Sequence, residues 1–196
     1  AVVPNSVDFA QFYAPPRDRG APPTVGFMYS AKSFKGADVA ARAIALARRD
    51  VPDLAVVALG TAEPSAALPL PEGADYVRDP PQDRLREVYA RCDLWLMPSV
   101  VEGYGLPLHE AMACRCPVVS SRTGAAADLV EEGGTGYTAE PGDAEGLARG
   151  IVAIASASLE HWRAMSDAAH ARAVRYSWDD AAALFERCLA GKSAEP

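Results

Sequence analysis

Short runs of apolar residues alternate with longer segments of helical periodicity along most of the chain. Six short, apolar runs predict strands: Thr24–Tyr29, Leu54–Leu59, Ala74–Arg78, Leu94–Met97, Pro117–Ser120 and Gly136–Thr138. Apolar residues at helical spacing predict helices over Gly36–Arg49, Gln82–Arg91, Ala125–Glu131, Asp143–Ala157, Leu159–Arg175 and Asp179–Leu189. Unbroken apolar strands separated by helices are typical of a parallel sheet covered on both faces. The pattern therefore predicts a single doubly wound α/β domain with about six strands.

The first two dozen residues break this pattern. They contain Pro15, Pro16, Pro22 and Pro23, and the chain starts without an initiator Met. This composition indicates the exit from a preceding domain. We therefore expect a linker over residues 1–23, a nucleotide-binding α/β domain over 24–175 and a C-terminal helix over 176–196.

Composition narrows the function classes. Hydrophobic residues make up 49% of the 196 residues, but no run approaches the ~18 uncharged apolar residues of a membrane span. No signal segment opens the chain, so a cytoplasmic location is expected by default. The net charge of -7 disfavours nucleic acid and an obligatory anionic membrane surface as partners, and leaves other membrane contact open. An anionic ligand would have to be held by local cations.

The cysteines and lysines are few. Only two of the four cysteines, Cys114 and Cys116, are close in sequence, and a zinc site needs a second pair at ligand spacing. We therefore expect buried, neutral thiols and no metal site. Two of the three lysines, Lys32 and Lys35, fall in one loop after the first predicted strand.

The stretch Pro98–Pro117 carries the clearest chemistry. A strand runs into a glycine loop, and Gly103 and Gly105 are expected to take backbone conformations closed to other residues. Pro107 suits the first position of the helix that follows. Unpaired amides at a helix start attract anions. This turn is therefore predicted to bind a phosphate at Gly105 and Leu106.

Two glutamates, Glu102 and Glu110, flank the turn with seven residues between them. Carboxylates repel a phosphate, so near one they need hydroxyl donors. A phosphate flanked by several hydroxyls describes a nucleotide-sugar. The simpler interpretation of Glu110 is a first-turn carboxylate that complements the helix dipole, worth only about 0.3 to 1 kcal/mol.

The pattern P-S-x-x-E-G-Y-G-L-P-x-x-E-A-M-A-C-x-x-P-V-V at Pro98–Val119 resembles the retaining glycosyltransferases of family four, specifically their C-terminal, donor-binding domain. Other stretches keep the family's order: P-N-S-V-D at Pro4–Asp8, F-K-G-A-D at Phe34–Asp38, G-G-T-G-Y-T-A-E-P-G-D at Gly133–Asp143 and Y-S-W-D-D at Tyr176–Asp180. The resemblance covers nearly the whole chain. It implies the GT-B fold, with this chain as its C-terminal, Rossmann-like half.

The resemblance implies roles for single residues. Glu102 would contact hydroxyls of the donor sugar near the reaction centre, and Lys35 the diphosphate, so these two are the candidate catalytic residues. Glu110 would bind the ribose. Tyr104, Gly105 and Leu106 would form the donor-binding loop around the phosphates.

One departure concerns the diphosphate. The family usually has an arginine where this chain has Ser30. Lys32 would supply the missing charge, or Ser30 would donate a neutral hydrogen bond. The alternative for Lys32 is a solvated loop cation.

Other positions are weighed against ordinary packing. Tyr76 and Val77 lie where the family holds the nucleobase, although strand packing explains Tyr76 equally well. His109 occupies a position that is usually apolar in the family, and we expect a partly exposed helix histidine there, not a catalytic base. Trp178 is expected to pack the terminal helix against the sheet.

The resemblance implies transfer of a sugar from a nucleotide diphosphate donor to an acceptor, with retention at the anomeric carbon and without a required metal or other cofactor. The acceptor site would belong to an N-terminal domain of the same protein, so this chain alone is expected to be inactive. Two alternatives are a non-catalytic nucleotide-binding or regulatory module and an interaction domain without a nucleotide site.

Overall fold

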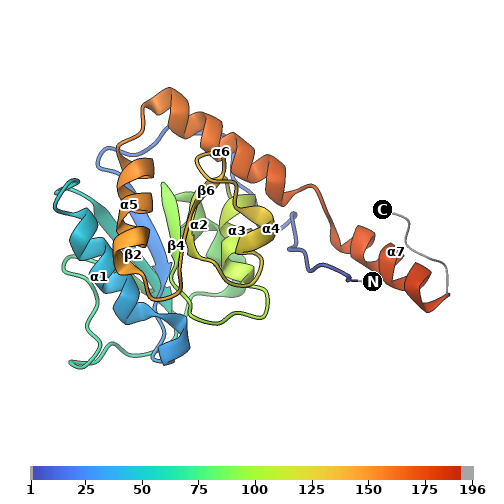
Figure 1. The fold of residues 1–196 in the computed structure, drawn as a ribbon, viewed down its shortest axis with the longest axis horizontal. Helices are drawn as coiled ribbons and strands as arrows, with labels where there is room; N and C mark the ends of the chain where they lie inside the picture. The colour runs from blue at the N-terminus through green and yellow to red at the C-terminus, as the bar shows by residue number, and fades with distance from the viewer. Residues whose placement is uncertain (1, 191–196) are drawn as a thin grey trace.

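The computed structural model describes residues 2–190 and contains one six-stranded parallel sheet. Its strands are β1 (Thr24–Met28), β2 (Ala55–Gly60), β3 (Asp75–Arg78), β4 (Leu94–Met97), β5 (Val118–Ser121) and β6 (Gly136–Ala139). They lie in the order β3-β2-β1-β4-β5-β6, and Figure 1 shows the sheet between its two layers of helices. The predicted doubly wound α/β fold is confirmed.

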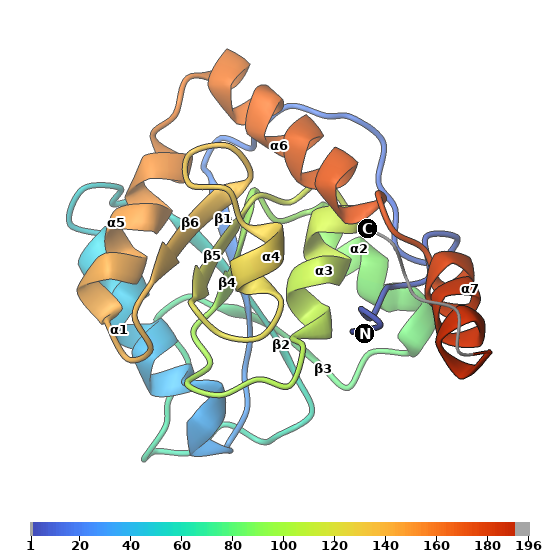
Figure 2. The same ribbon diagram turned by 45° about the vertical axis from the view of Figure 1, so that its right-hand side comes forward.

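Helices cover both faces of the sheet. They are α1 (Ala37–Ala47), α2 (Leu85–Ala90), α3 (Leu106–Ala113), α4 (Ala126–Leu129), α5 (Ala144–Ala155), α6 (Leu159–Ala173) and α7 (Trp178–Leu189), with short 3-10 turns η1 (Ser33–Lys35) and η2 (Gln82–Arg84). Helices α1 and α5 pack together on one face, and α2 and α3 lie on the other. Helix α6 runs from α5 toward α3 across one end of the sheet (Figure 2).

Strand β4 shows why the strands read as continuous apolar runs. All four of its residues are buried. Leu94 and Leu96 belong to the core beneath α1 and α5, whereas Trp95 and Met97 belong to the core beneath α2 and α3. Since successive side chains of a strand point to opposite faces, a strand buried on both sides has no polar alternation.

The N-terminal segment packs on the domain before β1 begins. Val7 and Phe12 are buried in the same core as α2 and α3. Farther along, the Arg17 guanidinium lies 2.6 Å from the Asp93 carboxylate and 5.1 Å from the centre of the Trp162 ring. The segment is thus fixed to the start of the sheet by both apolar and ionic contacts.

Helix α7 makes few contacts with the domain and extends away from the sheet (Figure 1). Ser177 and Asp180 form a capping box that begins the helix, and Ala181 is its one buried residue among those described. Trp178 is 49% exposed. The expectation that Trp178 packs this helix against the sheet is wrong, because the chain leaves the domain after α6 before the helix starts.

The thiols are buried as expected at three positions. Burial raises the pKa of Cys92 and of Cys114 to about 12, and burial also raises the pKa of Cys116. Within residues 2–190, no group of three His, Cys, Asp or Glu side chains is arranged to hold a metal ion. No helix in that range is long and apolar enough to cross a membrane.

Candidate functional site

The centre of the sheet contains the point where the chain changes direction. Strands β1 and β4 are neighbours, but the helix after β1 covers one face and the helix after β4 covers the other. Loops that diverge in this way leave a crevice at the carboxyl ends of the strands, where ligands of open α/β sheets bind. The predicted site residues on the β1–α1 and β4–α3 loops meet here.

These two loops are in backbone contact. The amide of Val100 donates a 2.8 Å hydrogen bond to the carbonyl of Phe34. Gly36 follows η1 with a φ of 67°, and a Cβ at this position would lie only 2.3 Å from the carbonyl oxygen of Pro98. A glycine is therefore required both by conformation and by space.

The two candidate catalytic residues form an ion pair across the loops. The Lys35 Nζ lies 2.8 Å from Glu102 Oε1, and their side chains are 25% and 10% exposed. The lysine Nζ also lies 5.7 Å from the centre of the Phe34 ring. Sequence reasoning placed both side chains in one crevice but did not predict that they pair. The arrangement places a cation and a carboxylate side by side in a small hollow that Pro107 of α3 also lines.

The glycine loop leads into α3 as predicted, with two differences. Gly105 has a φ of 92° and precedes the first helical residue, Leu106. Pro107 is therefore the second helical residue, not the first. Gly103 has neither a left-handed φ nor atoms within 4 Å of an added Cβ, so the special conformation expected there is wrong. Since no side chain caps α3 within the described chain, its first amides are available to an anion.

Tyr104 is held by the next loop of the sheet. The amide of Ala125 donates a 2.7 Å hydrogen bond to the Tyr104 carbonyl, and a Cβ on Gly124 would lie 2.3 Å from the same oxygen. The Thr123 hydroxyl donates to the carbonyl of Ser99 at 3.4 Å. The β5–α4 loop therefore fixes the backbone of the glycine loop at Tyr104. This contact was not predicted from the sequence, although Gly124 was a possible signal for it.

Glu110 is buried and already has one partner. The Tyr89 hydroxyl of α2 donates a 2.6 Å hydrogen bond to Glu110 Oε2. Burial raises the pKa of Glu110, while the bond from Tyr89 acts in the opposite direction. The simpler interpretation, a first-turn carboxylate that complements the helix dipole, does not fit, because Glu110 is the fifth residue of α3 and lies beyond its first turn. The sequence gave no sign of the bond between Tyr89 and Glu110, which are 21 residues apart.

His109 is 2% exposed, so the expectation of a partly exposed histidine is wrong. Its Nδ1 lies 2.8 Å from the Tyr104 hydroxyl and its Nε2 lies 2.9 Å from the Ala173 carbonyl oxygen. Burial lowers the pKa of His109, although the bond to Ala173 opposes this. The reason for the burial is that α6 ends against the face of α3 that carries this histidine.

The remaining predicted residues lie around the crevice without joining the ion pair. The Ser30 hydroxyl accepts a 3.3 Å bond from the amide of Lys32, whose side chain is exposed. On β3, the Tyr76 hydroxyl donates to the carbonyl of Ala62 at 2.6 Å, so its ring packs against the β2–β3 loop. Val77 packs against the opposite core.

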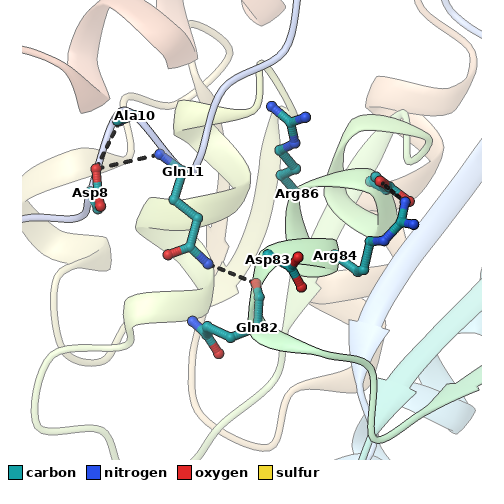
Figure 3. A pocket seen from close by; sticks show the side chains of 8 residues that line it. Asp8, Ala10, Gln11, Gln82, Asp83, Arg84 and Arg86 are labelled. Carbon is teal, nitrogen blue, oxygen red and sulfur yellow. Dashed lines mark hydrogen bonds and ion pairs between the residues drawn. The ribbon is translucent and has the colours of Figure 1, made fainter.

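A second hollow, of about 700 Å³, opens between the N-terminal segment and the start of α2 (Figure 3). Asp8 accepts hydrogen bonds from the amides of Ala10 and Gln11. The Gln11 side-chain amide donates a 2.7 Å bond to the carbonyl of Gln82. The side chains that line the hollow carry charges of both signs: Asp83 and Glu87 are acidic, and Arg84 and Arg86 are basic. None of the residues predicted for the site from the sequence lines this hollow.

The fold and the crevice define a Rossmann-like domain that holds a lysine, two carboxylates and a glycine-led helix start at its switch point. The sequence model of the family described as "Glycosyl transferases group 1" matches residues 22–157. The chain belongs to this family.

The relatives include proteins named as glycosyltransferases. The chain is 30% identical over 220 aligned positions to a D-inositol 3-phosphate glycosyltransferase from Segniliparus rotundus, covering 100% of this chain and 48% of that protein. It is 43% identical over 67 residues to an N-acetyl-alpha-D-glucosaminyl L-malate synthase from Bacillus anthracis, covering 34% of this chain and 18% of the relative.

Solved structures share the fold. A sucrose-phosphate synthase from Thermosynechococcus elongatus matches with a TM-score of 0.78 and 22% identity, over 97% of this chain and 53% of that one. The Anabaena protein Alr3699/HepE, solved in complex with UDP-glucose, matches with a TM-score of 0.78 and 21% identity, over 97% of this chain and 57% of that one. The chain thus spans about half the length of these proteins.

Proposed function

We propose that this chain is the donor-binding half of a retaining glycosyltransferase that takes a sugar from a nucleotide diphosphate donor. The observation that carries the proposal is the Lys35–Glu102 ion pair, whose charged atoms are 2.8 Å apart. The pair lies beside the start of α3, which no side chain caps among the described residues, and Glu110 lies one helical turn further along α3. These groups supply in one crevice what a nucleotide-sugar needs: donors for phosphate oxygens and acceptors for hydroxyls.

The diphosphate would bind at the helix start. The amides of Gly105 and Leu106, together with the Lys35 ammonium, would donate hydrogen bonds to phosphate oxygens. During transfer the bond between the anomeric carbon and the diphosphate oxygen breaks, and the electron pair leaves with the diphosphate. The amides and Lys35 would stabilise this growing charge more than the ground state, which is the requirement for catalysis.

Glu102 would serve the sugar. Its carboxylate is held by Lys35 and has a second oxygen to accept hydrogen bonds from sugar hydroxyls. A negative charge beside the ring also stabilises the positive charge that develops at the anomeric carbon as the leaving group departs. In the unliganded chain Lys35 neutralises Glu102, and a bound diphosphate would share the lysine.

Glu110 would bind the ribose hydroxyls with the carboxylate oxygen that Tyr89 does not occupy. The residues Tyr76 and Val77 at the carboxyl end of β3 would border the nucleobase, in this case through backbone and packing, since the Tyr76 hydroxyl already donates to Ala62. Ser30 and Lys32 would complete the phosphate side of the crevice.

An N-terminal domain of the same protein would supply the acceptor site. The Segniliparus rotundus relative and the two solved structures are each about twice as long as the part that this chain covers, which supports this proposal. We further propose a cytoplasmic enzyme that requires no metal or other cofactor, and that this chain alone does not turn over.

Calorimetric titration with uridine, guanosine and adenosine diphosphates tests donor binding. We expect at least one to bind, and Lys35→Met to weaken that binding roughly 10- to 100-fold, the worth of one charge-assisted hydrogen bond. The control is Arg42→Met, which removes an exposed cation of α1 whose nearest acidic partner is 3.8 Å away. Binding of no diphosphate at millimolar concentration, or equal loss in both variants, would refute the proposed site.

The second candidate is a nucleotide-binding module without catalysis. It is favoured by Ser30, which provides no cation where the family has an arginine, and by the neutralisation of Lys35 by Glu102. Sugar transfer by the full-length protein separates the two functions. If it occurs and Glu102→Gln abolishes it while nucleotide affinity persists, the chain belongs to an enzyme.

A further inference from the structure

Tyr104 of the glycine loop is paired through its hydroxyl with His109 of α3. His109 Nε2 lies 2.9 Å from the Ala173 carbonyl oxygen, and Nδ1 lies 2.8 Å from the Tyr104 hydroxyl. That hydroxyl is also 3.0 Å from the carbonyl oxygen of Asn5. The ring of Phe9 packs edge-on against the imidazole, with the ring centres 6.2 Å apart. Three contacts therefore join three segments that are far apart in sequence: the N-terminal segment, the Tyr104–His109 stretch and the end of α6.

The three contacts need three protons. A neutral imidazole and a tyrosine hydroxyl together carry two. One serves the contact with Ala173, and the tyrosine proton then goes either to His109 or to Asn5. An imidazolium carries the missing proton, because it donates from both nitrogens and frees the tyrosine to donate to Asn5. All three contacts can therefore be hydrogen bonds at the same time only when His109 is protonated.

The segments joined are those by which the chain enters and leaves the domain. Asn5 precedes the packed N-terminal segment, and Ala173 ends α6 just before the turn to α7. The Ser6 hydroxyl also donates a 2.8 Å bond to the carbonyl of Tyr176, which ties the two segments together. Tyr104 precedes Gly105 directly, so the contacts of its side chain fix the residue that leads into the start of α3.

We propose that His109 is a positioning residue that couples the glycine loop, through Tyr104, to the segments by which the chain enters and leaves the domain. Its relevance to donor binding rests on the proposed function. Protonation of His109 completes the network and holds the loop more firmly.

The surroundings of the histidine contain charges of both signs. A hollow of about 500 Å³ beside it is lined by Asp128 of α4 and by Arg172 and Arg175 at the end of α6. Arg172 lies 3.3 Å from Glu131. Charges of opposite sign therefore line this hollow, while the carboxylate of the neighbouring Glu110 accepts a hydrogen bond from Tyr89 of α2.

Burial places the change in protonation below the usual range of a histidine. Since the pKa of His109 is lowered in the folded chain, the neutral form predominates at neutral pH, and the third hydrogen bond forms as the solution is acidified. Tyr104 stays protonated throughout, because burial and Asp128 raise its pKa to about 12.

Amide hydrogen exchange of the unliganded chain tests the coupling without any nucleotide. We expect exchange at Ala125 and Leu108, whose amides donate to the carbonyls of Tyr104 and Gly105, to be roughly 2- to 10-fold faster in both His109→Leu and Tyr104→Phe, the effect of losing one net hydrogen bond. The Tyr104→Phe variant keeps the ring, so it remains informative if His109→Leu does not fold. The control is His161→Leu, on the exposed surface of α6, which should leave these rates unchanged.

A pH series supplies a readout that a purely structural role would not change. The ring nitrogens of His109 are followed by nuclear magnetic resonance, and the exchange ratio of Tyr104→Phe to wild type is measured at each pH. We expect this ratio to increase as pH falls through the titration of His109. Unchanged exchange in Tyr104→Phe, or a ratio that stays constant while His109 titrates, would overturn the inference. Absence of nucleotide binding would instead refute the proposed function and leave this result standing.

Discussion

Replacing Gly36 by alanine should separate the two loops that carry Lys35 and Glu102. Gly36 lies between η1 and α1 with a φ of 67°, and its missing Cβ would lie 2.3 Å from the Pro98 carbonyl oxygen. That oxygen belongs to backbone, and the loops are further joined by the bond from Val100 to Phe34. Neither side can move without giving up part of this contact.

The cost has two parts that a second glycine can separate. A left-handed conformation costs an alanine about 1 to 2 kcal/mol. Overlap in a packed site adds about 1 to 3 kcal/mol. Gly73 has a φ of 68° but nothing within 4 Å of an added Cβ, so Gly73→Ala carries only the first part. Effects on the unfolded chain are the same for both and cancel.

The free energy of unfolding of both variants is measured by urea denaturation, with thermal melting as a second measurement. We expect Gly36→Ala to be less stable than Gly73→Ala by about 1 to 3 kcal/mol, or roughly 2 to 12 °C in melting temperature. The difference arises from the approach of the two loops alone. Equal stability of the two variants would show that the loops do not constrain each other and would refute the reasoning.

Two further predictions concern buried carboxylates. Asp93 accepts hydrogen bonds from Arg17 and from the amides of Gly20 and Thr24, and it is 1% exposed. Asp93→Asn should lower the free energy of unfolding by about 3 kcal/mol, the low end for a buried ion pair, because Arg17 is 30% exposed. The control is Asp18→Asn at an exposed ion pair, which should lower the free energy of unfolding by under about 1 kcal/mol in the same urea experiment. A loss no larger than that of the control would contradict this. Glu110→Gln should raise the free energy of unfolding at pH 7. The pKa of Glu110 is raised in the folded chain, so the wild-type protein loses stability as pH rises from the usual pKa of a glutamate through the raised pKa, whereas a glutamine does not titrate. The gain should disappear below the usual pKa of a glutamate, and a gain that is independent of pH would show that the charge is not its cause.

The strands and most helices could be predicted because their signals are local. A continuous apolar run such as Leu94–Met97 needs burial on both faces, and a parallel sheet provides it. The glycine loop was also predictable, since Gly105 and the helix after it are adjacent in sequence. These features depend on residues within a few positions of one another.

What could not be predicted depends on distant segments. Lys35 and Glu102 are 67 residues apart, and nothing in either local sequence shows that they pair. The exposure of His109 was wrong because α6, more than 50 residues later, ends against it. The packing of Trp178 was wrong because amphipathic spacing shows which face is apolar but not whether anything lies against it.

The contact between Arg17 and Asp93 also decides where this domain can be exchanged between related enzymes. The carboxylate accepts from residues on both sides of the start of β1, and the preceding segment contributes Val7 and Phe12 to the core. A chimera joined at Thr24 would place a foreign segment against this surface and leave the Asp93 carboxylate without the Arg17 guanidinium. A junction placed before Pro4 would keep the ion pair and its apolar support within one parent sequence.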